Sequence, residues 1–453
     1  MKKQTILLLM LFTPIAIFSQ EYVGDEACQA CHANMPTQGF YQDYMDSGHP
    51  YKLNKVVDGQ PPAWPHTDPP PLPVCWEEQL EWSDVSYVIG GYFWKARFID
   101  HEGYIYTGLE GETTQWNIQN ETWGAYHAGE FGPDDDPRKP YNCGRCHTTG
   151  YDAEGGNQDD MPGMIGTWTE PGIRCEACHG PASDHIRDPQ NIQPENGKAC
   201  NECHYRDAEF RMPWKGGFTR HHQQGEDYSH SPHAGQDAFA DECMVCHEPH
   251  KSVVYDLGGI KEDTGCTSCH SDANYLVAGM EEVDCIDCHM PYMGKSAIKW
   301  NDHKGDIKGH LFAINPEPIF AVENLDTIDG KTYWKQDEDG MSASTLDYAC
   351  MGCHIDAEIQ DMADYAENIH QNHPSAVSND HVELPTSTSL GHAYPNPFNS
   401  ETKIDFSLRE TAEVKLMLYS AAGSEIATIV NGVRAAGTHD VVISAKDLPS
   451  GAY

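Results

Sequence analysis

Positive charge is scarce in this sequence. Its 453 residues hold 29 Lys and Arg against 70 Asp and Glu, which gives a formal net charge of −41. A chain this acidic repels phosphates and anionic headgroups, so nucleic acid and anionic membrane surfaces are excluded as partners. Acidity of this kind usually serves solubility, and docking to basic partner proteins is the alternative.

Long apolar segments are also scarce. An apolar stretch over residues 6–18 follows two lysines and ends just before Glu21, which is typical of a secretory signal peptide over residues 1–20. The stretch is too short to span a bilayer comfortably, and no later segment is long and apolar enough. We therefore expect an exported mature chain without a membrane span.

Cysteine is almost absent outside one repeated pattern. Sixteen of the 17 cysteines lie in eight copies of Cys-x-x-Cys, and a histidine directly follows every copy. Only Cys75 stands apart, and we interpret it as a buried free thiol, with linkage between chains as a minor alternative. In chain order, motifs 1 to 8 are Cys28–Cys31–His32, Cys143–Cys146–His147, Cys175–Cys178–His179, Cys200–Cys203–His204, Cys243–Cys246–His247, Cys266–Cys269–His270, Cys285–Cys288–His289 and Cys350–Cys353–His354.

The spacing within each motif suits one cofactor, haem c. Two cysteines three residues apart can form thioether bonds to the two vinyl groups of a porphyrin, and the next histidine reaches the iron from one face. Zinc needs four converging ligands and a disulfide needs no histidine, so neither alternative explains the histidine after every pair. We predict eight haem c groups, held by the sixteen motif cysteines and ligated on the proximal side by the eight motif histidines.

Histidines outside the motifs are numerous enough to ligate every iron a second time. The chain has 25 histidines, and subtracting the eight in motifs leaves 17. An iron with two histidine ligands has no open position, which favours electron transfer over catalysis. We select as distal ligands His49, His127, His185, His222, His233, His250, His310 and His370. Among the others, His221 is the alternative to its neighbour; His230, His303 and His373 are reserves; and His66, His101, His392 and His439 are non-ligands.

The spacing of the motifs predicts the organisation of residues 21–374, the cytochrome region. Periodic apolar segments are few there, so we expect short helices just after several motifs, loops wrapped around the haems, and little sheet. Residues 51–126 form an aromatic and proline-rich insert. Within it, residues 85–99 and 104–107 predict a small β-hairpin. A substrate-binding role is a minor alternative for this insert.

The composition changes near the C-terminus. Residues 375–392 are rich in Ser, Thr and Pro and predict a linker. Apolar residues then alternate with polar ones, as at Ile404, Phe406 and Leu408, so residues 393–453 predict a small β-sandwich.

Several phrases resemble known families. Tyr22-Val23-Gly24, Cys175-Glu176-Ala177-Cys178-His179-Gly180-Pro181, and Ser231-Pro232-His233-Ala234 leading to Cys246-His247-Glu248-Pro249-His250 resemble multihaem cytochromes of the c554-like kind. That resemblance implies distal roles for His185, His233 and His250. Tyr394-Pro395-Asn396-Pro397-Phe398-Asn399 and Leu448-Pro449-Ser450-Gly451-Ala452-Tyr453 resemble a type IX secretion sorting domain.

The second resemblance implies export through the outer membrane of a bacterium of the Bacteroidetes–Chlorobi kind. The domain then acts as an address that is often removed, and the protein is extracellular or on the outer cell surface. It is periplasmic if the sorting domain is inactive. Members of that family usually continue beyond the Gly-x-Tyr at which this chain stops, so we expect a truncated C-terminus.

The sequence as a whole predicts a secreted octahaem protein that transfers electrons to redox partner proteins or extracellular acceptors. Motifs near both ends of the cytochrome region motivate the further hypothesis of a homopolymeric filament with end-to-end haem contacts. One alternative is an octahaem oxidoreductase that reduces a nitrogen or sulfur oxyanion at one open-coordinate haem, although no Cys-x-x-Cys-Lys motif occurs. Another is an electron-storing binding module.

Overall fold

The chain forms two compact units, Met1–Asn372 and His373–Tyr453. The computed structural model describes residues 20–33, 39–131, 138–194, 200–207, 209–235, 242–261, 266–270, 280, 283–366, 369–370, 388–390, 393, 401–409, 412–420, 424–434 and 437–444. The predicted signal peptide up to residue 19, most of the predicted linker, and the histidines His373 and His392 lie outside the described residues. So do both phrases that carry the sorting-domain resemblance.

Short helices of the first unit coincide with the cysteine motifs. A helical turn places residues i and i+3 on one face, so it presents both cysteines of a motif in the same direction. The sequence-based prediction put helices after the motifs, and this is corrected, because the motif itself forms the turn. These elements are α1 (Asp25–His32), α3 (Gly144–His147), α4 (Cys175–His179), α7 (Cys266–Cys269), α8 (Cys285–His289), and the 3₁₀ turns η3 (Cys200–Glu202) and η5 (Glu242–Val245).

The other helical segments connect these turns. None of the helices in the described part of the chain is long and apolar enough to cross a bilayer. They are α2 (Phe40–Met45), α5 (Ser183–Arg187), α6 (Gln224–Ser229), α9 (Leu346–Ala349), α10 (Ile359–Ala366), η1 (Trp82–Asp84), η2 (Gln158–Asp160) and η7 (Ala321–Glu323).

A seven-stranded antiparallel sheet replaces the predicted hairpin. Its main path runs β1-β4-β5-β6-β9, with β7 paired to β5 and β8 paired to β7. The predicted strand over residues 85–99 is broken because the chain reverses after Gly90. The reversal requires glycine at position 91, where φ is 103° and a Cβ would lie 2.3 Å from the Trp64 ring. The strands are β1 (Leu53–Lys55), β4 (Tyr87–Gly90), β5 (Lys95–Ile99), β6 (Tyr104–Ile105), β7 (Gln115–Asn117), β8 (Thr122–Gly124) and β9 (Lys139–Pro140).

Both faces of this sheet are covered by apolar side chains. Val88 and Phe98 join one buried cluster, whereas Tyr87 and Ile99 join another on the opposite face, as the two-residue period of a strand requires. Cys75 lies in the first cluster with only 1% of its surface exposed, as expected for a buried thiol. The sheet is therefore a conventional core within a region otherwise poor in apolar periodicity.

Four smaller sheets complete the first unit, so sheet is more extensive than predicted. Most of these pairs are local, but β13 pairs in parallel with β14, which lies more than 70 residues further along the chain. Their strands are β2 (Val74–Cys75) with β3 (Glu78–Gln79), β10 (Thr148–Thr149) with β11 (Glu170–Pro171), β12 (Trp214–Lys215) with β13 (Phe218–Arg220) and β14 (Gly294–Lys295), and β15 (Leu325–Ile328) with β16 (Lys331–Trp334).

The second unit is built from strands alone among its described residues. β17 (Ser389–Leu390), β18 (Glu401–Leu408) and β21 (Gly437–Ser444) form one sheet, and β19 (Ala412–Tyr419) pairs with β20 (Glu425–Arg434). Phe406 and Leu408 of β18 share an apolar cluster with Val430 of β20, so the two sheets face each other. The alternation of apolar residues in the sequence predicts this arrangement.

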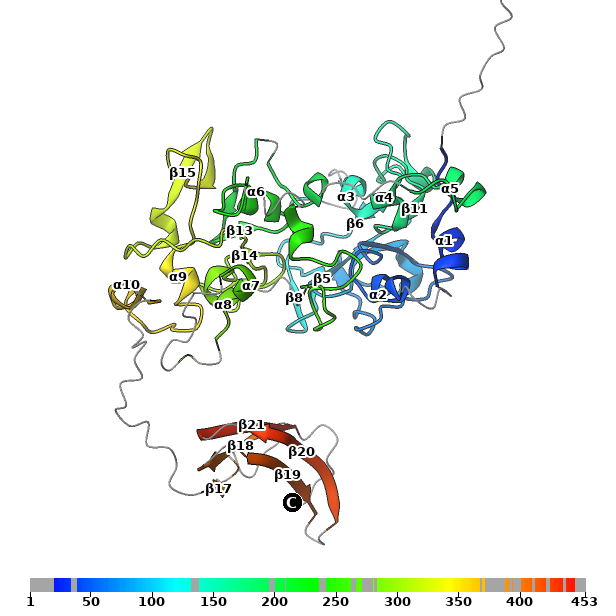
Figure 1. The fold of residues 1–453 in the computed structure, drawn as a ribbon. Coiled ribbons are helices and arrows are strands. Elements are labelled where there is room, and N and C mark those ends of the chain that lie inside the picture. The colour runs from blue at the N-terminus through cyan, green and yellow to red at the C-terminus, as the bar shows by residue number, and fades with distance from the viewer. Residues whose placement is uncertain are drawn as a thin grey trace, which may run out of the picture. The chain divides into compact units, whose positions relative to one another are not determined.

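The first unit is elongated, and its ends carry the first and the last motifs. Figure 1 shows α1, α4 and α5 at one end and α9 and α10 at the other. α1 ends at His32 of motif 1, and α9 directly precedes Cys350 of motif 8. Cofactors attached to the motifs are thus spread along the length of this unit.

Candidate cofactor sites

One hollow of about 2850 Å³ runs through the first unit. A site for a single small molecule usually holds about 300–1,000 Å³, so this space suits several cofactors at once. Every motif contributes at least one lining residue, including Cys146 of motif 2 and Cys350 of motif 8. The motifs scattered along the sequence therefore face a common interior.

Seven motif histidines lie opposite a histidine from outside the motifs. In each pair, a similar gap separates the two imidazole rings. The pairs and their centroid distances are His32 with His185 (6.4 Å), His147 with His222 (6.2 Å), His179 with His250 (6.1 Å), His204 with His49 (6.4 Å), His247 with His310 (6.1 Å), His270 with His233 (6.1 Å) and His289 with His370 (5.8 Å).

These gaps fit one metal ion between two imidazoles. A bond from imidazole nitrogen to a first-row transition metal is about 2 Å, as zinc shows, and a ring nitrogen lies about 1 Å from its centroid. Two such ligands on opposite sides of one iron put their centroids about 6 Å apart. Rings in direct contact would be closer, so the spacing matches axial ligation of a haem iron by both histidines.

The opposite nitrogen of several paired rings is anchored by hydrogen bonds. Nδ1 of His147 contacts the Lys52 carbonyl oxygen at 3.1 Å, and Nδ1 of His289 contacts the Phe312 carbonyl oxygen at 2.7 Å. An anchored Nδ1 fixes the ring and leaves the lone pair on Nε2 for the metal. The other anchors are Ile192 O for His185 (2.6 Å), Gln224 Oε1 for His204 (3.3 Å) and Glu248 Oε1 for His250 (3.0 Å).

Burial keeps several of these imidazoles neutral. Desolvation lowers the pKa of His49 and of His310 to about 3, and that of His147 to about 4. Desolvation also lowers the pKa of His222 well below its ordinary value. At neutral pH these rings are unprotonated, which is the form that binds a metal.

Two histidines do not fit the pairing. His127, a predicted distal ligand, is paired with no motif histidine in the described part of the chain, and its Nδ1 contacts Glu130 at 2.5 Å. His354 of motif 8 faces no second histidine within the described residues.

His222 lies 5.9 Å from His204 as well as 6.2 Å from His147, so it reaches two motifs.

Electrostatic neighbours place the motifs in one series. The thiols of Cys28 and Cys175 are neighbours, as are those of Cys146 and Cys203. For the other motifs, a cysteine or histidine of one motif lies near enough to act electrostatically on a group of the next. These pairs are Cys178 with Cys203, His204 with His247, Cys246 with Cys269, Cys266 with Cys285, and Cys288 with Cys350. The resulting order is 1–3–4–5–6–7–8, with motif 2 beside motif 4.

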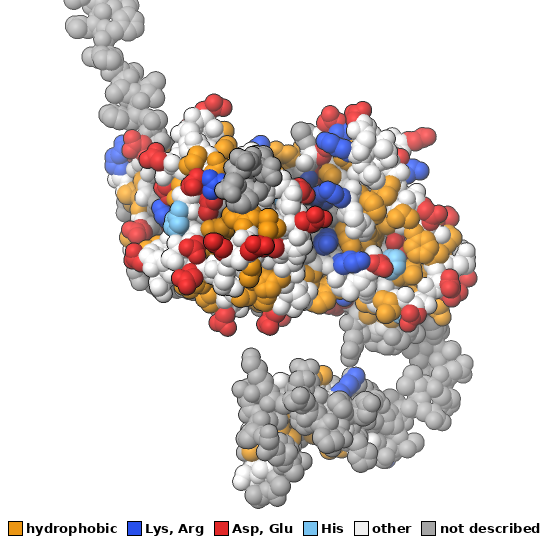
Figure 2. All heavy atoms as spheres, turned by 180° about the vertical axis from the view of Figure 1, so that it is seen from behind, with side chains coloured by type: hydrophobic (Ala, Val, Ile, Leu, Met, Phe, Trp, Pro, Cys, Tyr) orange, Lys and Arg blue, Asp and Glu red, His pale blue; other side chains and the backbone are white. Residues whose placement is uncertain are grey.

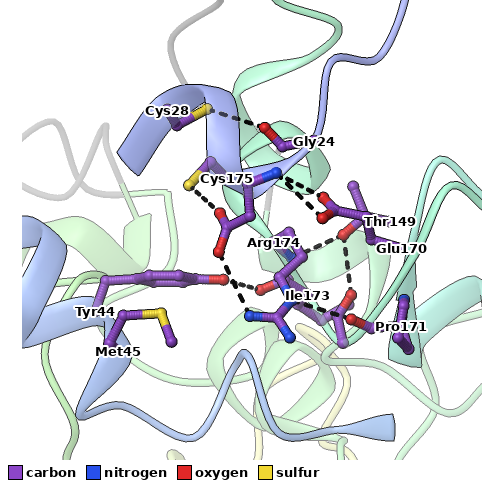
Figure 3. Close-up of polar contacts among 12 residues, drawn as sticks. Gly24, Cys28, Tyr44, Met45, Thr149, Glu170, Pro171, Ile173, Arg174 and Cys175 are labelled. Carbon is purple, nitrogen blue, oxygen red and sulfur yellow. Dashed lines mark hydrogen bonds and ion pairs between the residues drawn. The ribbon is translucent and has the colours of Figure 1, made fainter. Parts of the chain in front are cut away.

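The junction between motifs 1 and 3 shows how the fold creates such contacts. Asp25 at the start of α1 accepts a hydrogen bond from Cys175 at 2.8 Å and ion-pairs with Arg174 at 3.4 Å. Its backbone N–H donates to the Glu170 carboxylate at 3.0 Å, and Tyr44 donates to the Ile173 carbonyl (Figure 3). Polar contacts with long sequence separation thus hold two motifs edge to edge.

A cluster of cations lies beside the His147–His222 pair. Burial and then the charge of Lys95 lower the pKa of His221, whose ring is 4.9 Å from His222. Lys95 donates to the Ser296 carbonyl oxygen at 2.6 Å, and Arg97 donates to Gln115 at 2.9 Å, so neutral oxygens are their acceptors. Burial lowers the pKa of Lys95 well below its ordinary value, so the firmest cations around His221 are Arg97, Arg206 and Arg220.

Three family models match separate parts of the chain. The model for cytochrome c554 and c-prime matches residues 112–180, and that for a doubled CXXCH motif matches residues 230–275. The model for a secretion system C-terminal sorting domain matches residues 392–453.

The chain is a multihaem c-type cytochrome with a C-terminal type IX sorting domain. It binds haem c through its CXXCH motifs, and the sorting domain marks it for secretion by the type IX system. A 139-residue segment of this cytochrome is 27% identical to the multiheme cytochrome MtrA of Shewanella baltica (strain OS185). The match covers 27% of this chain and 36% of MtrA, so it spans about a third of that relative's length.

Two solved structures are similar to the cytochrome at low sequence identity. The outer cell wall cytochrome OcwA aligns with a TM-score of 0.46 at 16% identity, covering 76% of this chain and 86% of OcwA. The octaheme sulfite reductase MccA of Wolinella succinogenes aligns with a TM-score of 0.49 at 16% identity, covering 74% of this chain and 65% of MccA.

Sequence reasoning missed the residues that orient the ligands. The anchors of Nδ1 include the backbone carbonyls of Lys52 and Phe312, which carry no residue-type signal. Glu248 was visible in the sequence, because it stands between His247 and His250. Only the structure shows that its carboxylate reaches the ring of His250.

Proposed function

We propose that this cytochrome holds eight haems and conducts electrons along its length as a continuous relay. The observation that carries the proposal is the series of electrostatic neighbours from motif 1 to motif 8, in which each motif lies near the next. Haem iron supplies the one-electron chemistry. For motifs 1 to 7 the protein would contribute two imidazoles to each iron, and an iron held in this way would pass electrons without binding a substrate.

In this proposal seven irons have named ligand pairs. The proximal ligands are the motif histidines, and the distal ligands are His185, His222, His250, His49, His310, His233 and His370 for motifs 1 to 7 in order. His127 has no place in this scheme. The distal position of motif 8 is left open to assignment. The reserve histidine His303 lies beside this motif, since a Cβ on Gly352 would lie 3.4 Å from the His303 carbonyl oxygen.

The acceptor of the electrons is proposed to lie outside the cell. The sorting domain supports secretion, and location at or beyond the outer surface is the expected result. Figure 2 shows acidic side chains spread over the visible face of the first unit, with a smaller group of Lys and Arg near its middle. An acidic surface suits docking of basic redox proteins or of oxidised mineral acceptors.

Contact between copies at motifs 1 and 8 would extend the relay into a filament.

Intact mass together with electron paramagnetic resonance of the oxidised protein tests this function. The relay predicts a mass increment of eight haems and, for at least seven of them, low-spin ferric signals. A smaller increment, or several high-spin signals, would contradict it. Electron microscopy at high concentration tests the filament, which is rejected if only single copies are seen.

A second function, reduction of a nitrogen or sulfur oxyanion, is favoured by one observation. The cation cluster beside His147 would attract an anion. His222 could ligate the iron of motif 4 instead, since its ring is 5.9 Å from His204. The motif 2 iron would then keep an open position that faces the cations.

Addition of sulfite or nitrite to the oxidised protein separates the two functions. The enzyme predicts one high-spin signal that changes on addition of the anion. An unchanged, fully low-spin spectrum for the motif 2 haem would reject the enzyme and leave the relay as the remaining function.

A further inference from the structure

The five anchored histidines differ in the charge of their hydrogen-bond acceptor. Four acceptors are neutral oxygens: three backbone carbonyls and the amide of Gln224. The fifth is the carboxylate of Glu248, which lies 3.0 Å from Nδ1 of His250. Among these five, only the His179–His250 pair therefore has an anion attached to its ring.

The local sequence holds this carboxylate in place. Glu248 Oε1 also accepts from the backbone N–H of His250 at 3.3 Å, so one oxygen contacts both the ring and the backbone of the same residue. Pro249 between them has a fixed φ and restricts the preceding residue to extended backbone. On the other side, the ring of Phe40 packs 5.4 Å from that of His250.

We propose that Glu248 is a positioning residue that lowers the reduction potential of the motif 3 haem. A ring N–H that donates to a carboxylate gives the imidazole anionic character and makes it a stronger donor to the metal. A stronger donor and a nearby negative charge both favour ferric over ferrous iron. This inference rests on the proposed relay, because it takes His179 and His250 as the two ligands of one iron.

The place of motif 3 gives this tuning a consequence. Its cysteines adjoin motif 1 through Cys28–Cys175 and motif 4 through Cys178–Cys203. Every electron that moves between motif 1 and the remaining motifs passes this point. A lowered potential here makes the motif 3 haem harder to reduce and so places an uphill step between motif 1 and the other motifs.

Gln224 provides a reciprocal experiment within the same chain. Its amide oxygen contacts Nδ1 of His204 at 3.3 Å, which matches the contact of Glu248 with His250. Glu248→Gln keeps an acceptor but removes the charge, whereas Gln224→Glu adds a charge at motif 4. Glu202→Gln is the control, since Glu202 is an exposed carboxylate of motif 4 and no hydrogen bond joins it to a ligand ring among the described contacts.

The measurement is a redox titration of the holoprotein, followed through the low-spin ferric resonance signals. Glu248→Gln should raise the reduction potential of one haem by about 59 mV. For a one-electron couple this equals about a tenfold change in the ferric-to-ferrous ratio at a given potential. Gln224→Glu should lower a different potential by a similar amount, and Glu202→Gln should move none that far. The signal of the affected haem should also change its g-values, which a purely structural role would not cause.

His250→Ala separates failure of this inference from failure of the relay. Loss of one low-spin signal in His250→Ala, with unchanged potentials in Glu248→Gln, would overturn the role of Glu248 and leave the ligand pair standing. A full set of low-spin signals in His250→Ala would overturn the pairing and the inference together.

Discussion

At the level of single residues, a ligand histidine needs a defined ring direction as well as a free Nε2. His49 shows how neighbouring residues supply this. Gly48 is required because a Cβ there would lie 2.9 Å from the Tyr92 ring, and the backbone N–H of Ile173 donates to the His49 carbonyl at 3.0 Å. These backbone contacts direct the His49 ring at His204, and any residue other than glycine at position 48 would disturb them.

Replacement of His185 tests the pairing with His32. His185→Ala should remove one distal ligand, so one haem should change from low-spin to high-spin while its covalent attachment persists. His127→Ala is the matched control, because His127 faces no motif histidine in the described part of the chain, and all signals should stay low-spin. The measurement is the resonance spectrum of the oxidised protein at low temperature. A high-spin signal in His127→Ala but not in His185→Ala would reverse the assignment.

Single residues could be predicted from the sequence only where local spacing carries the information. The motif cysteines and histidines are fixed by five-residue patterns. The ring partners are separated by 37 residues for His233 and His270 and by 155 residues for His49 and His204, so no local pattern connects them. His127 was selected for its position before motif 2, and position in the chain does not determine which ring it faces.

At the level of elements, buried carboxylates join segments that the sequence leaves far apart. Glu176 in α4 is only 1% exposed and accepts hydrogen bonds from Val23 N (3.0 Å), Gly24 N (2.9 Å) and Ala182 N (2.8 Å). These contacts fasten the chain before α1 onto α4 and thereby place motif 1 against motif 3.

Removal of this carboxylate should loosen the N-terminal segment. Glu176→Ala leaves three backbone N–H groups without their acceptor, and we expect a loss of about 3 kcal/mol in the free energy of unfolding. Glu202→Ala removes an exposed carboxylate near another motif and should cost less than about 0.5 kcal/mol. Denaturant unfolding of the holoprotein and proteolysis near residues 20–33 give the comparison. Equal stability of the two variants would refute the role of Glu176.

The extent of the sheet could not be read from the sequence because both of its faces are buried. A strand with one wet face alternates apolar and polar residues, whereas Tyr87, Val88 and Ile89 are consecutive apolar residues. Such a run resembles a single hairpin strand and gives no sign of how many partners pair with it. In the second unit the alternation at Ile404, Phe406 and Leu408 is regular, and the strands there follow the prediction.

At the level of the whole molecule, the interior of the first unit belongs largely to the cofactors. Its hollow of about 2850 Å³ is lined by residues of every motif. Conventional apolar clusters exist around the large sheet, around Phe218 and Trp334, between α9 and α10, and in the second unit. We expect the motif segments between these clusters to depend on porphyrin faces for burial.

Protein made without haem attachment should therefore lose most of its structure in the first unit. We expect weak near-ultraviolet circular dichroism and rapid proteolysis of residues 20–370, with the β-strands of residues 401–444 more resistant, because their apolar cluster involves no motif. Holoprotein treated in parallel is the control. A cofactor-free chain with native protease resistance throughout would show that the haems are not needed as a core.

The relay itself is tested most directly by an anomalous X-ray map recorded at the iron absorption edge on crystals of the holoprotein. The account predicts eight iron peaks, seven of them midway between the named histidine pairs and about 3 Å from each ring centroid. It also predicts that the peaks follow the order 1–3–4–5–6–7–8, with that of motif 2 beside motif 4. Fewer than eight peaks, or a break in that series, would contradict it.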